Sequence, residues 1–237
     1  MFPYVPQRIQ QVRIPSADQL DQLPWKHSTS GELPLKEAYE FKHHQFQELP
    51  WAKIIWNIKI RSPKSLFVWR LLHCKLRTDD NLMSRGCNIP SMCSICLKNT
   101  KITYHLFFDC PLALRLWSWL SYSVNLVFQF SSLEDIWKIV DKSWSPQCKI
   151  LITATLINVL NTIWYVRNQA RFNHRMIPWK LAVSMIIASS SLFGNSTSKT
   201  LNNSIRDFTI LKTIFCNIHQ PKPQVIKGVL WHPPLVN

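Results

Sequence analysis

Four residues in the middle of the chain have the types and the spacing of a metal site. Cys93 and Cys96 form a C-x2-C pair, and His105 and Cys110 follow it as H-x4-C. Two cysteines three positions apart can reach one ion from a single tight turn, and a histidine with a third cysteine can complete a tetrahedron. Zn2+ prefers such sulfur and nitrogen ligands, and four protein ligands with no open position are typical of a structural site. The spacing therefore predicts a closed zinc site.

A C-x2-C pair by itself is also compatible with redox chemistry, and seven cysteines place some close together by chance. A redox pair would not need His105 and Cys110 at these distances, and no strand–helix alternation of a thioredoxin-like fold surrounds the motif. Zinc binding is therefore the favoured interpretation. The remaining cysteines fit neither half of the spacing and are predicted to be small buried hydrophobic residues: Cys74, Cys87, Cys148 and Cys216.

The overall composition favours a folded chain with an anionic partner. Its 237 residues are 46% hydrophobic, which is enough for one good core or two small ones. Four glycines against fifteen prolines argue against a strand-rich fold that turns on glycine. The 28 basic and 13 acidic residues give a net charge of +15, which favours RNA or DNA before a membrane. Candidate phosphate contacts near the motif are Lys59, Arg61, Lys64, Arg70, Lys75, Arg77, Arg85, Lys98 and Lys101.

The carboxylates do not form a pattern typical of an enzyme. A polymerase needs paired carboxylates that hold metal ions on a rigid sheet. Asp79 and Asp80 instead follow Thr78 at the expected start of a helix, where a threonine cap and acidic residues are both favourable. A ribonuclease H site would need several converging carboxylates, and we predict no enzyme because residues 126–237 offer mainly Glu134, Asp135, Asp141 and Asp207.

Helical periodicity extends over most of the chain, so we expect a mainly α fold. It would consist of a small zinc-stabilised helical domain, further helices and an extended C-terminal tail. Breaks are expected at Arg61–Pro63, at Ser189–Ser191 and at 194–198. Pro111 suits the first turn of a helix whose apolar face includes Leu114. The expected helices span residues 35–46, 51–58, 64–76, 79–85, 111–125, 133–142, 147–170, 178–193 and 203–218.

One segment, 150–166, is apolar enough to suggest a membrane span. It is shorter than the typical length of about 20 residues. Thr155, Asn158 and Thr162 also form a polar stripe along it, which favours a packed helix of a soluble protein. The odd cysteine count and the missing secretory signal predict an intracellular protein, in the nucleus or cytoplasm and not secreted.

Several segments together resemble a known family. The runs Ile60–His73 and Leu76–Leu82, the Cys/His motif and Trp117 resemble the reverse-transcriptase zinc-binding domain of plant non-LTR (LINE-type) retrotransposon polyproteins. The resemblance covers roughly residues 20–125, and it implies zinc as the cofactor of the four ligands. Lys101 and Ile102 stand where relatives usually carry Glu-Thr, so the resemblance implies a decaying or truncated copy.

Two later fragments are similar to other parts of the same polyproteins. Ile163–Asn168, together with Phe172, resembles the connector that precedes their ribonuclease H domain. Val229–Pro234 resembles the lead-in to that domain, whose catalytic residues would lie beyond it. The implied partners, besides nucleic acid, are reverse transcriptase or ribonuclease H domains of related polyproteins. The expected divisions are an N-terminal tail (1–19), the zinc-binding domain (20–125), a helical connector (126–219) and a Pro-rich tail (220–237).

Motif, charge and resemblance together predict a non-catalytic zinc-binding module that binds RNA or DNA through its basic residues. Two alternatives remain open. The region could be a structural remnant that docks polymerase and ribonuclease H domains against each other. It could also be a pseudogene product with no nucleic-acid binding of its own.

Overall fold

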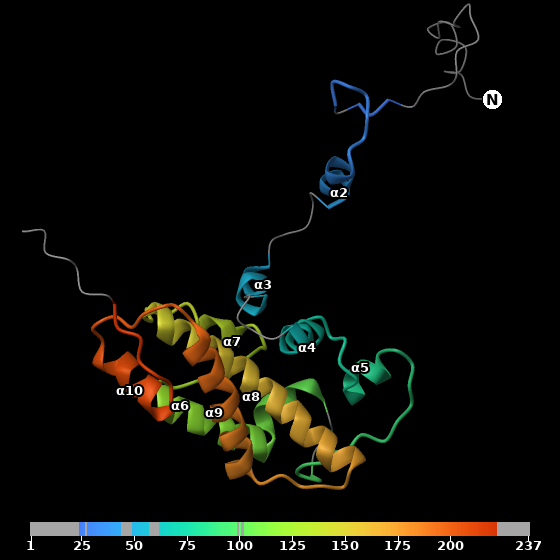
Figure 1. The fold of residues 1–237 in the computed structure, drawn as a ribbon. Helices are drawn as coiled ribbons and strands as arrows, with labels where there is room; N and C mark the ends of the chain where they lie inside the picture. Colours follow the sequence, from blue (N-terminus) through green and yellow to red (C-terminus); the bar gives the residue numbers. More distant parts are fainter. Residues whose placement is uncertain are drawn as a thin grey trace, which may run out of the picture. The chain divides into compact units, whose positions relative to one another are not determined.

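The computed structural model describes residues 24–26, 28–43, 49–56, 62–98, 100 and 102–221. These residues form helices and connecting turns, without a strand among them (Figure 1). The expectation of a mainly α fold is confirmed. The chain divides into two units, residues 1–48 and residues 49–237, which are described separately. The expected tail at 1–19 lies outside the described residues, as does the expected tail at 220–237 apart from its first two residues.

The first unit contains a turn and one helix, α2 (Leu35–His43). In the turn, the Trp25 N–H donates to the carbonyl of Gly31 over 2.6 Å. Gly31 adopts φ 76°, a left-handed conformation that glycine reaches without strain. The Trp25 and Phe41 rings meet edge to face, with centroids 4.9 Å apart. The expected helix over 35–46 is thus confirmed to residue 43, and its last residues lie outside the described part.

Two long helices, α8 (Pro146–Phe172) and α9 (Trp179–Ser196), form the centre of the second unit, with α9 turning back along α8 (Figure 1). The expected break at Ser189–Ser191 is wrong, because these serines lie inside α9. Two of their hydroxyls have partners there: Ser190 accepts a hydrogen bond from Asn158 over 2.9 Å, and Ser191 donates to the carbonyl of Ala188. The break expected at 194–198 is also displaced, since α9 continues to Ser196.

Within the described residues, α8 is the one helix long and apolar enough to cross a membrane. However, 72% of its most apolar window is buried inside the fold. The polar stripe of Thr155, Asn158 and Thr162 is buried as well. The Thr155 hydroxyl donates to the carbonyl of Leu151, and Asn158 bonds to α9 and accepts from Lys64. Polar side chains that are buried and hydrogen-bonded within the protein in this way are typical of the core helix of a non-membrane protein.

Helices α3 (Pro50–Ile55), α4 (Ser62–Leu72) and α5 (Asp79–Met83) precede the metal motif. The two helices expected on either side of Arg61–Pro63 are separate, but Ser62 and Pro63 already belong to α4, which begins two residues earlier than expected. A proline is tolerated in the first turn because its missing N–H would have no helical partner. Helix α4 also ends earlier than expected. Cys74 adopts φ 52°, and the Lys75 N–H closes the helix by donating to the carbonyl of Arg70 over 2.7 Å.

The helix that follows the motif is α6 (Pro111–Val124), as expected from Pro111. It is followed by its cap residue Asn125, which adopts the left-handed conformation with φ 50°. Leu114 is 55% exposed, so its assignment to the apolar face is wrong. The reason is that Leu114 falls at the edge of the buried stripe. That stripe consists of Leu112, Ala113, Leu116, Trp117, Leu120 and Val124.

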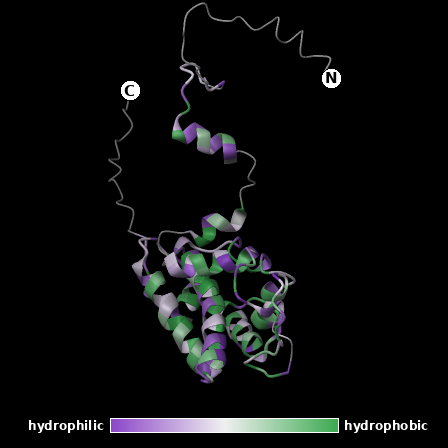
Figure 2. Ribbon diagram, turned by 90° about the vertical axis from the view of Figure 1, so that its right-hand side faces the viewer, coloured by the Kyte–Doolittle hydropathy of each residue, from purple (hydrophilic) through white to green (hydrophobic). Residues whose placement is uncertain are grey.

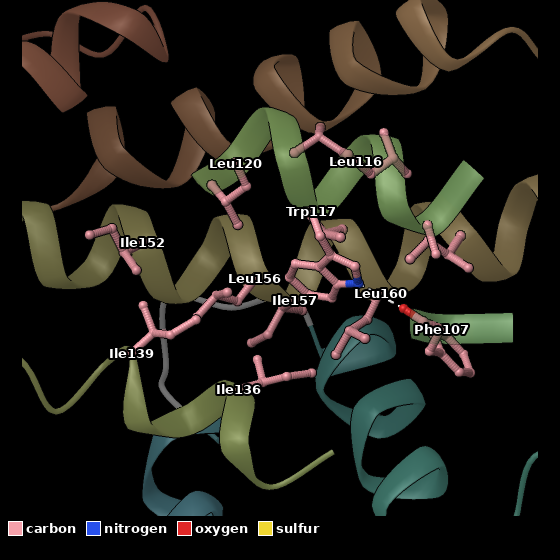
Figure 3. Close-up of a cluster of buried hydrophobic side chains, with 14 of the residues drawn as sticks. Phe107, Leu116, Trp117, Leu120, Ile136, Ile139, Ile152, Leu156, Ile157 and Leu160 are labelled. Carbon is pink, nitrogen blue, oxygen red and sulfur yellow. Dashed lines mark hydrogen bonds between the residues drawn. The ribbon is translucent and has the colours of Figure 1, made fainter. Parts of the chain in front are cut away.

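The hydrophobic core joins α6 to α7 (Asp135–Lys138) and α8, as Figure 3 shows around Trp117. Helices α7 and α10 (Ile205–Thr213) are shorter than expected. Along their length the helices carry both hydrophobic and hydrophilic residues (Figure 2). The core includes residues on both sides of position 125, and the division expected there stays a prediction. Cys148 and Cys216 are buried as expected, whereas Cys74 and Cys87 are exposed and were assigned wrongly.

Candidate metal centre

The four residues of the motif lie together in the structure. Cys93 and Cys96 are placed by a turn in which the Leu97 N–H donates to the Cys93 carbonyl over 2.9 Å. Leu97 itself adopts φ 56°, which closes this turn. His105 begins the π-helix η1 (His105–Asp109), and Cys110 follows it directly. The three Sγ atoms and one imidazole nitrogen all lie within 4.8 Å of one another.

The spacing of these atoms fits a tetrahedral zinc site. With Zn–S bonds of about 2.3 Å and a Zn–N bond of about 2.0 Å, two sulfurs lie about 3.8 Å apart and a sulfur and a nitrogen about 3.5 Å apart. The Sγ atoms of Cys93 and Cys110 are 3.9 Å apart. The Cys96 Sγ and the His105 Nε2 are 3.4 Å apart. Three soft thiol donors with one imidazole are also the donor set that Zn2+ prefers.

The π-helical turn explains how His105 and Cys110 reach the same point. In η1, the Cys110 N–H donates to the carbonyl of His105, five residues earlier, over 2.7 Å. One wide turn therefore separates the two side chains. Such π-turns are rare and are often found at functional sites. Pro111 follows at once and starts α6, so Cys110 lies at the junction of η1 and a long core helix.

A buried tryptophan ties this turn to the core. The Trp117 indole N–H donates to the main-chain carbonyl of Phe107 over 2.7 Å (Figure 3). Leu106 and Phe107, which lie on η1, are fully buried in the hydrophobic core. The position of the motif is therefore set by packing and by a buried hydrogen bond, in addition to any metal bonds.

The electrostatics of the cysteines favour a cation. A hydrogen bond from the Cys110 thiol, supported by the N–H groups of Ile95 and Cys96, lowers the pKa of Cys93 to about 4, although burial acts in the opposite direction. The same hydrogen bond and burial raise the pKa of Cys110. One thiolate and one thiol thus share a proton. Metal binding releases such protons, because the bound ligands are deprotonated.

Asp80, on α5, is hydrogen-bonded to Thr103, which lies two positions before the candidate ligand His105. Asp80 accepts hydrogen bonds from the main-chain N–H of Thr103 over 2.9 Å and from its hydroxyl over 3.0 Å. The Thr78 hydroxyl lies 2.9 Å from that of Thr103. Thr78 occupies the N-cap position of α5, but its side chain makes no cap bond to the helix, which corrects the expected capping role. Burial raises the pKa of Asp80, but hydrogen bonds from Thr78 and Thr103 more than offset this and lower it.

The basic candidates fall into three groups. Arg70, Lys75, Arg77, Arg85 and Lys98 are exposed. Lys64 is half-buried and donates to the side-chain oxygen of Asn158. Lys59, Arg61 and Lys101 lie outside the described residues. The sequence interpretation missed Arg167 and Arg171, which lie on α8 close to α5; the run Ile163–Asn168 was the available signal for them.

The comparisons with known proteins agree with the site. Residues 34–117, which include all four candidate ligands, match the family model described as zinc-binding in reverse transcriptase. The chain is 23% identical over 103 residues to an Arabidopsis thaliana protein named "Putative ribonuclease H protein", covering 41% of this chain and 16% of that protein. The match thus spans about a sixth of that relative. No solved structure matches the chain. The family resemblance is confirmed: residues 34–117 are similar to the zinc-binding domain of reverse transcriptases, which binds metal and is not itself a catalytic domain.

Proposed function

We propose that this protein is a non-catalytic, zinc-stabilised helical module that binds RNA or DNA through its basic residues. The observation that carries the proposal is the convergence of Cys93, Cys96, His105 and Cys110 at tetrahedral spacings. Four such donors leave no position for a substrate or water, so zinc would serve the fold and not a reaction.

Zinc would fix the segment between Cys93 and Cys110. This segment connects α5 to α6, and the ligands lie at its two ends. Because Cys110 precedes α6 directly, a metal bond at this position would fix the start of that helix. The segment would then be a rigid part of the surface, and it carries the exposed Lys98.

The support for nucleic-acid binding is electrostatic. The net charge is +15, and Arg70, Lys75, Arg77 and Arg85 are exposed before the motif. Contacts from such residues to phosphates are independent of sequence and weaken with salt, because binding releases counterions from the nucleic acid. RNA and DNA are both compatible with this mode.

The direct test is a binding titration of the zinc-loaded chain against a labelled single-stranded oligonucleotide at several salt concentrations. We expect the logarithm of the association constant to fall linearly with the logarithm of salt, by about 0.7 per phosphate contact. Affinity that does not change with salt would refute the phosphate mechanism. Absence of binding at low salt would refute nucleic-acid binding altogether.

A second candidate function is docking between domains. It is favoured by the matched relative, in which the similar segment is 16% of a much longer chain. The zinc-loaded module would then bind a reverse transcriptase or ribonuclease H domain of a related polyprotein. A pull-down with such a domain, together with no retention of nucleic acid, would support docking over the first proposal.

A further inference from the structure

A groove of about 910 Å³ lies between α4, α5 and the C-terminal half of α8. Its size is near the upper end of the range of about 300–1,000 Å³ typical of ligand sites. It brings together two segments far apart in the sequence, since α4 and α5 precede the metal motif and α8 follows it (Figure 1). Its walls contain Arg70, Lys75, Arg77, Arg85, Arg167 and Arg171, and no acidic residue.

This charge is only partly compensated inside the protein. The buried carboxylate of Asp79 accepts from the Arg171 guanidinium over 3.1 Å, behind the groove. Arg85 donates to the main-chain carbonyl of Cys74, which orders the side chain without neutralising it. Clefts lined by charge of one sign concentrate ligands of the opposite sign. The groove is therefore suited to a polyanion.

Arg167 provides an independent indication of a ligand. Its side chain is 2% exposed, although a buried guanidinium is costly without full hydrogen bonding. Two of its nitrogens donate to neutral oxygens, the main-chain carbonyl of Arg77 over 3.2 Å and the side chain of Asn168 over 2.7 Å. Its Nε is buried and has no hydrogen-bond partner among the described residues. The fold thus holds a donor at the groove whose bonding capacity is incomplete.

Aromatic rings lie beside the arginines. The Arg167 guanidinium is 4.5 Å from the centroid of the Trp164 ring, which also lines the groove. Phe172 also lines the groove and is 65% exposed, and the guanidinium of Arg171 lies 5.6 Å from the centroid of its ring. Phosphate-binding cations next to exposed rings are the combination used for single-stranded nucleic acids, whose bases stack on aromatic side chains.

We infer that this basic groove is where the chain binds single-stranded RNA or DNA, with phosphates on its exposed arginines and lysine (Arg70, Lys75, Arg77 and Arg85) and a base stacked on Phe172. The inference depends on the proposed nucleic-acid binding and gives it a location. From Trp164 to Phe172 the helix rises about 12 Å, at 1.5 Å per residue. This length corresponds to about three stacked nucleotides at 3.4 Å each.

The test compares two double variants that carry the same change in net charge. Lys75→Gln with Arg77→Gln alters the groove, whereas Lys142→Gln with Lys180→Gln alters exposed lysines that do not line it. Binding of a fluorescently labelled twelve-nucleotide single strand is measured by anisotropy as a function of salt. Each phosphate contact contributes a factor of about 5 in affinity at 0.1 M salt. The affinity of the groove variant should therefore be about 25-fold lower than that of the wild type and should depend less on salt. The affinity of the control variant should fall much less.

A second comparison tests stacking. Phe172→Ala should lose at least about fivefold in affinity for the normal strand, and little for an abasic strand of the same length. Tyr122→Ala, an exposed aromatic residue on α6, is the matched control and should bind as the wild type does. Circular dichroism of all variants, compared with the wild type, verifies that they are folded.

The outcomes separate the two proposals. Equal losses in both double variants, with clear binding by the wild type, would overturn the groove and leave nucleic-acid binding in place. No binding by the wild type would overturn the proposed function itself. Displacement of the oligonucleotide by polyglutamate as effectively as by an unlabelled strand would show an acidic peptide site and overturn the assignment to nucleic acid.

Discussion

Removal of the metal should destabilise this protein, because the folded chain holds the four ligands together. The Cys93–Cys110 and Cys96–His105 distances of 3.9 and 3.4 Å are already close to those of a zinc tetrahedron, so binding needs little rearrangement. A ligand present at 1,000 times its dissociation constant stabilises the folded state by about 4 kcal/mol. For a chain of this size, 1 kcal/mol corresponds to about 2–4 °C, so a chelator should lower the melting temperature by about 8–16 °C.

The assay combines metal analysis with thermal melting. Purified wild-type protein should contain one zinc ion per chain, and melting should be followed with and without EDTA. Cys93→Ser with Cys96→Ser should contain no zinc and should show no chelator effect. Cys74→Ser with Cys87→Ser is the matched control, because both of these cysteines are exposed and outside the cluster. It should retain both the zinc and the chelator-induced shift.

The comparison of each variant with itself, with and without chelator, matters because Cys93 is fully buried. A serine at that position costs stability through its buried hydroxyl, independently of any metal. Wild-type protein that contains no zinc and melts at the same temperature with EDTA would refute the reasoning. A chelator shift of equal size in the Cys93/Cys96 double variant would refute it as well.

Three further predictions concern the surroundings of the site and the core. Gly194→Ala should destabilise the chain by up to about 2 kcal/mol, because the new Cβ would lie 2.4 Å from the Cys216 Sγ. This overpacking outweighs the gain in helix propensity from glycine to alanine. Adding Cys216→Ala should restore the stability, as measured by urea titration. Trp117→Phe should cost about 1–2 kcal/mol by thermal melting, because it leaves the buried carbonyl in η1 without its donor. Asp80→Asn should be less stable than wild type at neutral pH. The pKa of Asp80 is lowered in the folded state, so its contribution is complete above the ordinary value of about 3.9, and the difference in urea midpoint should shrink as the pH falls below 4.

The sequence was sufficient to predict the parts of the fold that depend on local signals. The four-residue spacing identified the cluster, Pro111 identified the start of α6, and the long apolar run identified α8. These features are encoded by residue types at fixed distances along the chain. They do not depend on which other segment packs against them.

The predictions that were wrong or missing depend on contacts between segments far apart in the sequence. Ser189–Ser191 has the composition of a loop, yet it remains helical because Ser190 finds a partner in Asn158 on another helix. Cys74 and Cys87 have the residue type of a buried position but lie at exposed positions between helices. The arginines on α8 were missed for the same reason, since only the fold brings Arg167 next to Arg77. Pairings of this kind cannot be read from periodicity.

The contacts of α4 and α5 with α8 have a consequence for synthesis of the protein on the ribosome. Lys64 is bonded to Asn158, and Asp79 to Arg171, across 94 and 92 positions. At about 5–20 residues per second, the 47 residues from Asn125 to Phe172 take about 2–9 s to be made. During that interval the emerging helices lack the partner that covers their apolar sides. A chaperone that holds nascent chains should therefore raise the yield of soluble protein, and a chain shortened to end at Asn125 should be degraded quickly in the cell.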